Sequence, residues 1–207
     1  MLIVPVILCL AVILLLPLVI TGLTLDIVTV AVAKLGFAPG LAIVLLIAMI
    51  VGSAINIPLY QKSFRPVGMS WPHQRTVVAL NVGGGLIPVL LAIYQFTQGH
   101  WMAILATVAI VTWVSYTSAQ VVPGIGIRMN AMVAPLTAVL CGWLLGGAAA
   151  PSVAFAGGIL GTLMGADLLH LRVIERLSSG VLSIGGAGVL DGIALCGLFS
   201  LLLEIGR

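Results

Sequence analysis

Two aspartates are the residues of this sequence whose type and position could do chemistry. Asp167 lies in the stretch GILGTLMGADLLHL and Asp191 lies in SIGGAGVLDGIALCGL, so both acids stand inside long apolar runs. An ionised aspartate at the centre of a membrane helix costs about 2.5 to 3.5 kcal/mol on insertion scales, so water, a proton or a partner must compensate for it. Two carboxylates that share one proton can activate water and protonate a leaving group. The pair therefore predicts a catalytic site.

Polar residues gather toward one end of the expected membrane helices, at the depth of Asp167. Helices weakened by glycine are tolerated in a membrane where the backbone is buried in protein or lines water. We therefore expect a hydrated cavity that opens to the cytoplasm. The predicted substrate-binding residues are Asn56, Asn81, Asn130, Gly188 and Gly192. An alternative is that the asparagines only bridge neighbouring helices.

Charge is scarce along the chain, which is 62% hydrophobic and 6% charged with a mean hydropathy of +1.33. A soluble domain carries roughly 25% charged residues, so most of this surface is expected to face a lipid bilayer. The net charge of +3 comes from scattered basic residues without a cluster, which excludes a nucleic-acid partner. The remaining acids, Asp26, Glu175 and Glu204, fall in loops or at helix ends and are predicted to be solvated.

The long apolar runs predict an all-α fold, a polytopic bundle of about seven membrane helices that forms one transmembrane domain over residues 1–207, because a span needs about 20 apolar residues. The expected spans are Met1–Leu23, Ala38–Leu59, Thr76–Thr97, Trp101–Ala119, Asn130–Gly147, Pro151–Leu171 and Gly180–Leu203. Between them, Thr24–Phe37 is expected to be an interfacial helix, and Val121–Met129 a loop that dips into the membrane.

The basic residues of the expected loops predict the orientation. Counting the loops alternately puts six basic residues on one side and only Lys34 and Arg207 on the other. The six are Lys62, Arg65, Arg75, Arg128, Arg172 and Arg176. Because short cytoplasmic loops carry an excess of Lys and Arg, the N-terminus is expected inside and the C-terminus outside.

Metal and cofactor chemistry has no pattern to support it in this sequence. Cys9, Cys141 and Cys196 stand singly inside apolar runs, without a CxxC spacing, and the three histidines belong to separate segments. Single buried cysteines of this kind usually act as small packing residues. We therefore predict no metal site and no cofactor.

Three segments resemble a known family. GSAINIPL (52–59), GADLLHL (165–171) and SIGGAGVLDGI (183–193) resemble an uncharacterised family of bacterial and archaeal membrane proteins, the domain of unknown function numbered 1614. The resemblance covers nearly the whole chain and implies a multi-pass protein of the prokaryotic inner membrane. That family brings no established activity.

The two aspartates also resemble those of the GxGD-type intramembrane aspartyl proteases, the presenilin and signal-peptide-peptidase group. Members of that group carry one aspartate on each of two consecutive helices, and the second follows Gly-x-Gly directly. Here Gly186-Ala187-Gly188 stands before Asp191, with two further residues between them, and Ala166 precedes Asp167 where that group has tyrosine. The resemblance implies catalytic roles for Asp167 and Asp191 and transmembrane peptides as substrates.

Three functions remain open from the sequence. The first is an intramembrane aspartyl protease that uses the two aspartates. The second is a proton- or ion-coupled transporter, in which Asp191 binds the cation and Asn81 belongs to the substrate site. The third is a non-catalytic membrane subunit or scaffold, which packs against partners or a second copy of itself through glycine-rich helix faces.

Overall fold

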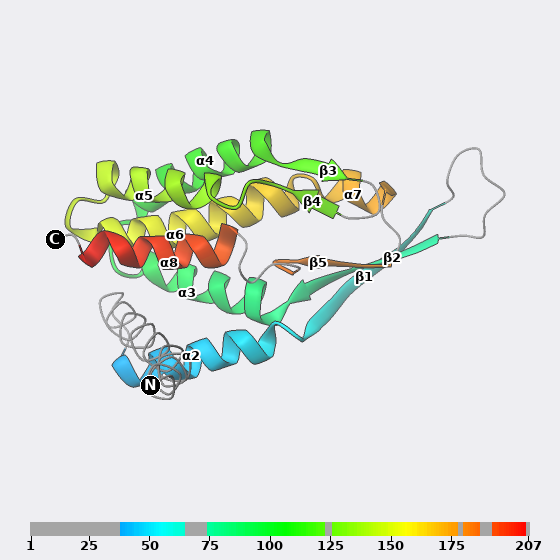
Figure 1. Ribbon diagram of the computed structural model, residues 1–207, viewed down its shortest axis with the longest axis horizontal. Coiled ribbons are helices and arrows are strands. Elements are labelled where there is room, and N and C mark those ends of the chain that lie inside the picture. The colour runs from blue at the N-terminus through cyan, green and yellow to red at the C-terminus, as the bar shows by residue number, and fades with distance from the viewer. Residues whose placement is uncertain (1–37, 65–73, 123–125, 178–179, 187–191, 206–207) are drawn as a thin grey trace, which may run out of the picture. The chain divides into compact units, whose positions relative to one another are not determined.

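The computed structural model describes residues 38–64, 74–122, 126–177, 180–186 and 192–205 (Figure 1). The chain divides into two compact units, Met1–Leu45 and Leu46–Arg207. In the first unit the described part is the start of helix α2 (Pro39–Gly52), which ends in the second unit.

Helix α6 (Ala150–Thr162) is the centre of the helical part of the second unit. It packs against α3 (Ile87–Phe96), α4 (Trp101–Ser118), α5 (Val133–Leu145) and α8 (Gly192–Ile205) (Figure 1). Most of its residues are buried, and α6 contains no charged residue. This central helix therefore holds the bundle together through apolar contacts.

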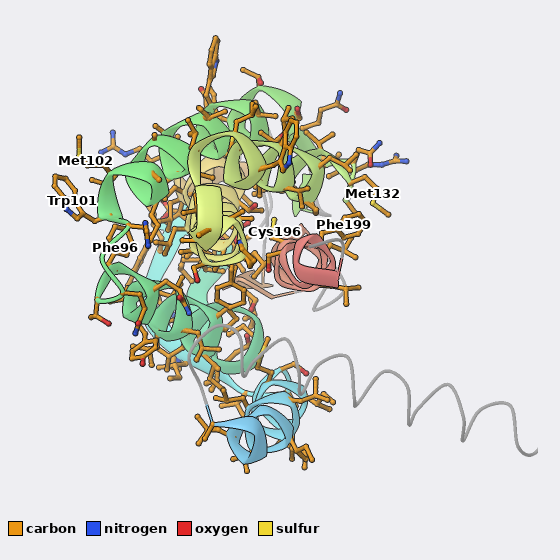
Figure 2. The ribbon with its side chains drawn as sticks, turned by 90° about the vertical axis from the view of Figure 1, so that its left-hand side faces the viewer. Phe96, Trp101, Met102, Met132, Cys196 and Phe199 are labelled. Carbon is orange, nitrogen blue, oxygen red and sulfur yellow. The ribbon has the colours of Figure 1, made fainter. Side chains whose placement is uncertain are left out.

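Small residues on α6 let its neighbours approach closely. A Cβ atom added to Gly161 would lie 2.6 Å from the Cβ of Val111 in α4. A Cβ added to Gly158 would lie 2.8 Å from the Cβ of Cys196 in α8. Figure 2 shows Cys196 on the inner side of α8, whereas Trp101 and Met102 point outward from the first turn of α4. Close backbone approach of this kind is how membrane helices associate.

Three strands form a mixed sheet in the order β1-β2-β5. β1 (Asn56–Phe64) is antiparallel to β2 (Gln74–Asn81), and β5 (Gly180–Ile184) is parallel to β2. Two shorter antiparallel strands, β3 (Gln120–Val122) and β4 (Gly126–Arg128), form a second sheet. The remaining elements are the π-helical turns η1 (Val82–Leu86) and η3 (Leu163–Leu168), the 3₁₀ turn η2 (Gly147–Ala149) and helix α7 (Leu171–Leu177).

The two faces of the three-stranded sheet have different surroundings, because side chains alternate between faces along a strand. On one face, Val78 and Ile184 pack with Leu163 of η3 in a small apolar core. The register of the strands puts Asn81 and Ser183 on the opposite face. The sheet therefore has an apolar face toward η3 and a face with polar side chains.

The prediction of an all-α bundle of seven spans is wrong. The expected span Ala38–Leu59 leaves the helix at Gly52 and enters β1, Thr76–Thr97 begins as β2, and Gly180–Leu203 begins as β5. The β-branched and aromatic residues of these segments fit a sheet, and a short apolar run does not distinguish a buried strand from a buried helix. Strands β2 and β5 also pair across about 100 residues of sequence, which no local pattern reveals.

Within the described residues, two helical stretches are long and apolar enough to cross a membrane, Trp101–Ser118 and the continuous run Gly147–Glu175 through α6, η3 and α7. By length and composition they indicate membrane association. The expected span Trp101–Ala119 matches α4 to within one residue. The expected segments Met1–Leu23 and Thr24–Phe37 lie outside the described residues.

The segment expected to be a membrane-dipping loop, Val121–Met129, instead contributes to the β3–β4 sheet. Val121 pairs with Ile127 and Val122 pairs with Gly126, whose φ of +115° requires glycine. The described backbone groups of residues 121–122 and 126–128 are thereby paired between the two strands.

Candidate functional site

Asp167 lies in η3, where the regular helix of α6 widens into a π-helical turn. The amide of Leu169 donates to the carbonyl oxygen of Met164 at 3.0 Å, five residues back instead of four. Gly165 makes this possible on the side of α4, because a Cβ there would clash with the carbonyl oxygen of Thr112. Single π-helical turns inside longer helices are frequent at functional sites, so the position of Asp167 in such a turn supports a functional role.

His170 supports this turn from its C-terminal end. Its Nδ1 atom lies 3.0 Å from the carbonyl oxygen of Gly165 and 3.1 Å from that of Ala166, so a protonated Nδ1 donates to both. The imidazole ring stacks on Tyr116 of α4, with ring centroids 4.7 Å apart. The two carbonyls immediately before Asp167 are therefore held by a side chain that is itself fixed by stacking.

The Asp167 carboxylate reaches the end of β5. Its Oδ2 atom accepts a hydrogen bond of 2.9 Å from the amide of Gly185. Gly185 has a φ of +64°, and its carbonyl oxygen lies where a Cβ of Gly84 would be, so two glycine backbones meet here. Six residues after Gly185 the sequence reaches Asp191. The structure thus brings the first aspartate to the segment that leads to the second.

Three further predicted residues follow Gly185 in the sequence. Gly188 and Asp191 lie outside the described residues, and Gly192 is the first residue of α8. The structure therefore does not test the predicted pairing of the two carboxylates.

Asn81 and Asn56 are joined directly. Asn81 is 3% exposed, and its Nδ2 donates to the carbonyl of Ser53 at 2.7 Å and to Oδ1 of Asn56 at 3.2 Å. Its Oδ1 accepts from the amide of Gly84 at 2.7 Å, which caps the turn η1. The hydroxyl of Ser183 also donates to Oδ1 of Asn56. This network of hydrogen bonds connects β1, β2 and β5 to the turn η1.

The network and Asp167 lie on different sides of the sheet. Asn81 and Ser183 are on the face opposite the apolar core with η3, whereas Asp167 belongs to η3. The link between them is the backbone from Ser183 to Gly185 at the end of β5. Asn130, the third predicted asparagine, is exposed and makes a local bond, its Oδ1 accepting from the amide of Met132 at 3.0 Å.

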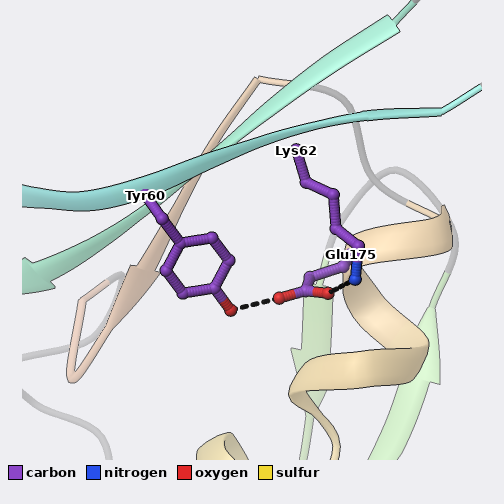
Figure 3. A network of polar contacts seen from close by, with 3 residues as sticks. All are labelled: Tyr60, Lys62 and Glu175. Atoms are coloured by element: carbon purple, nitrogen blue, oxygen red, sulfur yellow. Dashed lines mark hydrogen bonds and ion pairs between the residues drawn. The ribbon is translucent and has the colours of Figure 1, made fainter.

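Glu175 of α7 is the functional candidate that the sequence reasoning missed (Figure 3). The prediction that it is solvated is wrong, because Glu175 is 3% exposed. The Tyr60 hydroxyl donates to its Oε1, and the Lys62 ammonium lies 2.6 Å from its Oε2. This bond to the carboxylate raises the pKa of Tyr60, so its hydroxyl remains a donor. The spacing Tyr-x-Lys in a strand, which puts both side chains on one face, could have revealed the pair.

Comparison with known proteins gives one match. The sequence profile of a family described as protein of unknown function (DUF1614) matches residues 50–203, about three quarters of the chain. The matched region begins near the end of α2 and includes β1, β2, η3, β5 and most of α8. No curated protein and no solved structure is significantly similar to the chain. The chain belongs to the DUF1614 family of proteins of unknown function.

Proposed function

We propose that this protein is an intramembrane aspartyl protease, a multi-pass protein of the prokaryotic inner membrane that uses Asp167 and Asp191 as its catalytic pair. The observation that carries the proposal is the hydrogen bond between the Asp167 carboxylate and the Gly185 amide. The six-residue connection from Gly185 to Asp191 can span at most about 20 Å, which limits how far the second acid can lie from the Gly185 end of β5. The resemblance to the GxGD proteases supports the same pairing.

The chemistry follows from two carboxyl groups that hold one proton between them. Asp167, which accepts a backbone N–H, takes the role of the base and removes a proton from water. The resulting hydroxide attacks the carbonyl carbon of a peptide bond, while the protonated Asp191 donates to the carbonyl oxygen. Collapse of the tetrahedral intermediate breaks the C–N bond: the proton held by Asp167 passes to the leaving nitrogen, and one hydroxyl of the intermediate returns its proton to Asp191 as the carboxylic acid forms.

Strand β5 offers a place for the substrate backbone. It is the last strand in the sheet order, and among the described strands it pairs only with β2. Val181 in this strand is 67% exposed. An extended peptide can bind by adding a strand to such an edge. A substrate paired with β5 would run past Ile184 and Gly185 toward the Asp167 carboxylate.

The test is cleavage of a single-pass transmembrane peptide by the purified protein in lipid vesicles, with the products identified by mass spectrometry. Asp167→Asn and Asp191→Asn should each reduce cleavage at least about 100-fold, since a carboxamide neither accepts nor donates the required proton. The double variant should be no worse than either single one. Asp26→Asn is the matched control and should retain activity. Cleavage that persists in both single variants would exclude the proposal, and proton-coupled uptake lost in Asp191→Asn alone would identify a carrier.

A further inference from the structure

The basic residues collect at one end of the second unit. Every lysine and arginine among the described residues lies in β1, β2, β4 or α7. These residues are Lys62, Arg75, Arg128, Arg172 and Arg176. Helices α3, α4, α5, α6 and α8 contain no lysine or arginine. Figure 1 shows that β3, β4, α7 and the three-stranded sheet occupy the same end of this unit.

This end lies at the depth of lipid headgroups if α4 crosses the membrane. The 18 residues of α4 extend about 27 Å, close to the hydrocarbon thickness of a bilayer. The chain enters β3 two residues after α4 ends at Ser118, and α7 packs against β3. Along the run that starts with α6, Arg172 lies 22 residues after Ala150, or about 33 Å. With α4 across the bilayer, Arg128 and Arg172 would both lie just beyond the hydrocarbon layer.

The surface around Arg172 combines charge with exposed apolar side chains. Leu169 is 54% exposed and Val173 is 48% exposed, on either side of the exposed Arg172. The acid of this helix, Glu175, is buried, and its two oxygens bond to Tyr60 and Lys62. This combination fits a membrane surface. The apolar side chains would enter the boundary of the acyl chains, and the Arg172 guanidinium would bind a lipid phosphate through two hydrogen bonds.

We propose that Arg128, Leu169, Arg172 and Val173 form a binding surface for anionic phospholipid headgroups on the cytoplasmic leaflet; we name it the α7 surface. The elements at this end contain five described lysines and arginines and two described acids, Asp167 and Glu175. The excess of positive charge selects anionic over zwitterionic lipids, and each basic residue near a membrane surface contributes about 1 kcal/mol of attraction. The proposal of this surface requires that the protein is inserted in a membrane, and it does not depend on protease activity.

Arg75 provides a matched control. It is exposed, and the strand alternation of β2 puts it on the face opposite Thr76, the residue that pairs with Lys62. Lys62 bonds to α7 through Glu175, so Arg75 lies on the sheet face away from α7. Arg75→Gln removes the same charge as Arg172→Gln without touching the proposed surface.

The experiment measures thermal unfolding of the full-length protein in a neutral detergent, with additions of phosphatidylglycerol, phosphatidylcholine or inorganic phosphate. Phosphatidylglycerol should raise the unfolding temperature at a concentration at least tenfold lower than phosphatidylcholine, and inorganic phosphate should not reproduce the effect. The preference should weaken in Arg172→Gln, persist in its charge-matched control Arg75→Gln, and disappear in Arg128→Gln/Arg172→Gln. Arg172→Lys, which retains charge without bidentate bonding, should show an intermediate preference.

Three outcomes would overturn the proposal. Equal stabilisation by the two lipids would show that the surface does not select charge. An equal loss in Arg75→Gln would show a general effect of net charge. Stabilisation by inorganic phosphate alone would show a small-anion site in place of a lipid surface. None of these measurements uses a protease substrate, so failure here is distinct from failure of the proposed activity.

Discussion

The bundle around α6 and the sheet end around Asp167 are built by different physics. In the bundle, Gly158 and Gly161 bring apolar helix surfaces together, and α6 contributes no charge. At the sheet end, Asn81, Asp167 and Glu175 are held by directed hydrogen bonds to backbone and side chains. Buried polar groups cost free energy unless all their bonds are made. All lysines and arginines among the described residues also lie at the sheet end, so this region combines charge with directed hydrogen bonds.

This difference between the bundle and the sheet end predicts that the sheet end is the less tolerant of substitution, because its arrangement depends on individual atomic contacts. In the bundle an added Cβ on Gly158 or Gly161 first meets side-chain carbon atoms, whereas at the sheet end an added Cβ on Gly84 meets a backbone carbonyl oxygen. Substitutions at these contacts test this comparison.

Gly84→Ala should have the largest effect. The added Cβ would clash with the carbonyl oxygen of Gly185, so the turn η1 and the end of β5 must separate. We expect a loss of about 3 kcal/mol in the free energy of unfolding, at the upper end of overpacking costs. Gly40→Ala is the control, because no atom lies within 4 Å of its added Cβ. Equal unfolding temperatures of the two variants in detergent would show that the glycine contact does not hold the sheet end together.

Glu175→Ala should have the next largest effect on the free energy of unfolding. It leaves the Tyr60 hydroxyl and the Lys62 ammonium without their acceptor, and Lys62 can turn toward solvent because its side chain is 52% exposed. Because of this exposure we expect about 2 kcal/mol, less than the 3 to 5 kcal/mol of a fully buried broken pair. A double-mutant cycle with Tyr60→Phe, followed by thermal unfolding, measures the coupling. Additivity of the two changes would contradict a shared network.

Asn81→Ala should cost about 1 to 2 kcal/mol, as expected for a lost helix cap. The side chain caps η1 through Gly84 and ties it to Ser53 and Asn56. Asn130→Ala is the matched control, because the exposed Asn130 makes a local bond to Met132. Chemical denaturation of both variants checks the expectation. If Asn130→Ala lowered the free energy of unfolding as much as Asn81→Ala, the cap on η1 would have no special contribution to stability.

The sequence predicted parts of this region and missed others for identifiable reasons. The sequence grouped Asn56 and Asn81 with Asp167 at one depth, because a polar residue in an apolar run needs a partner; the structure joins Asn81 to Asn56, whereas Asp167 bonds to Gly185. The extent of α4 also followed from its uninterrupted apolar run. The strands were missed because β2 and β5 pair across a long stretch of chain. Glu175 was missed because its partners lie 115 and 113 residues away in sequence.

His170→Phe should have the smallest effect on stability and the most local one. Phenylalanine can keep the stacking on Tyr116, but it cannot donate to the carbonyls of Gly165 and Ala166. The net loss of such a hydrogen bond is about 1 kcal/mol, so the fold should persist while the turn around Asp167 opens more often. Hydrogen exchange followed by mass spectrometry should show faster exchange in residues 163–170 and unchanged exchange in α6.

Tyr116→Leu completes the test, because it removes the stacking and leaves the imidazole donor in place. It should accelerate exchange in the same residues less than His170→Phe does, since the hydrogen bonds to the carbonyls remain. Uniform acceleration across α6 and η3 would show that the π-helical turn and the bundle open as one unit. The comparison between the two regions would then fail, because Asp167 would be held by the packing of α6 and not by its own polar contacts.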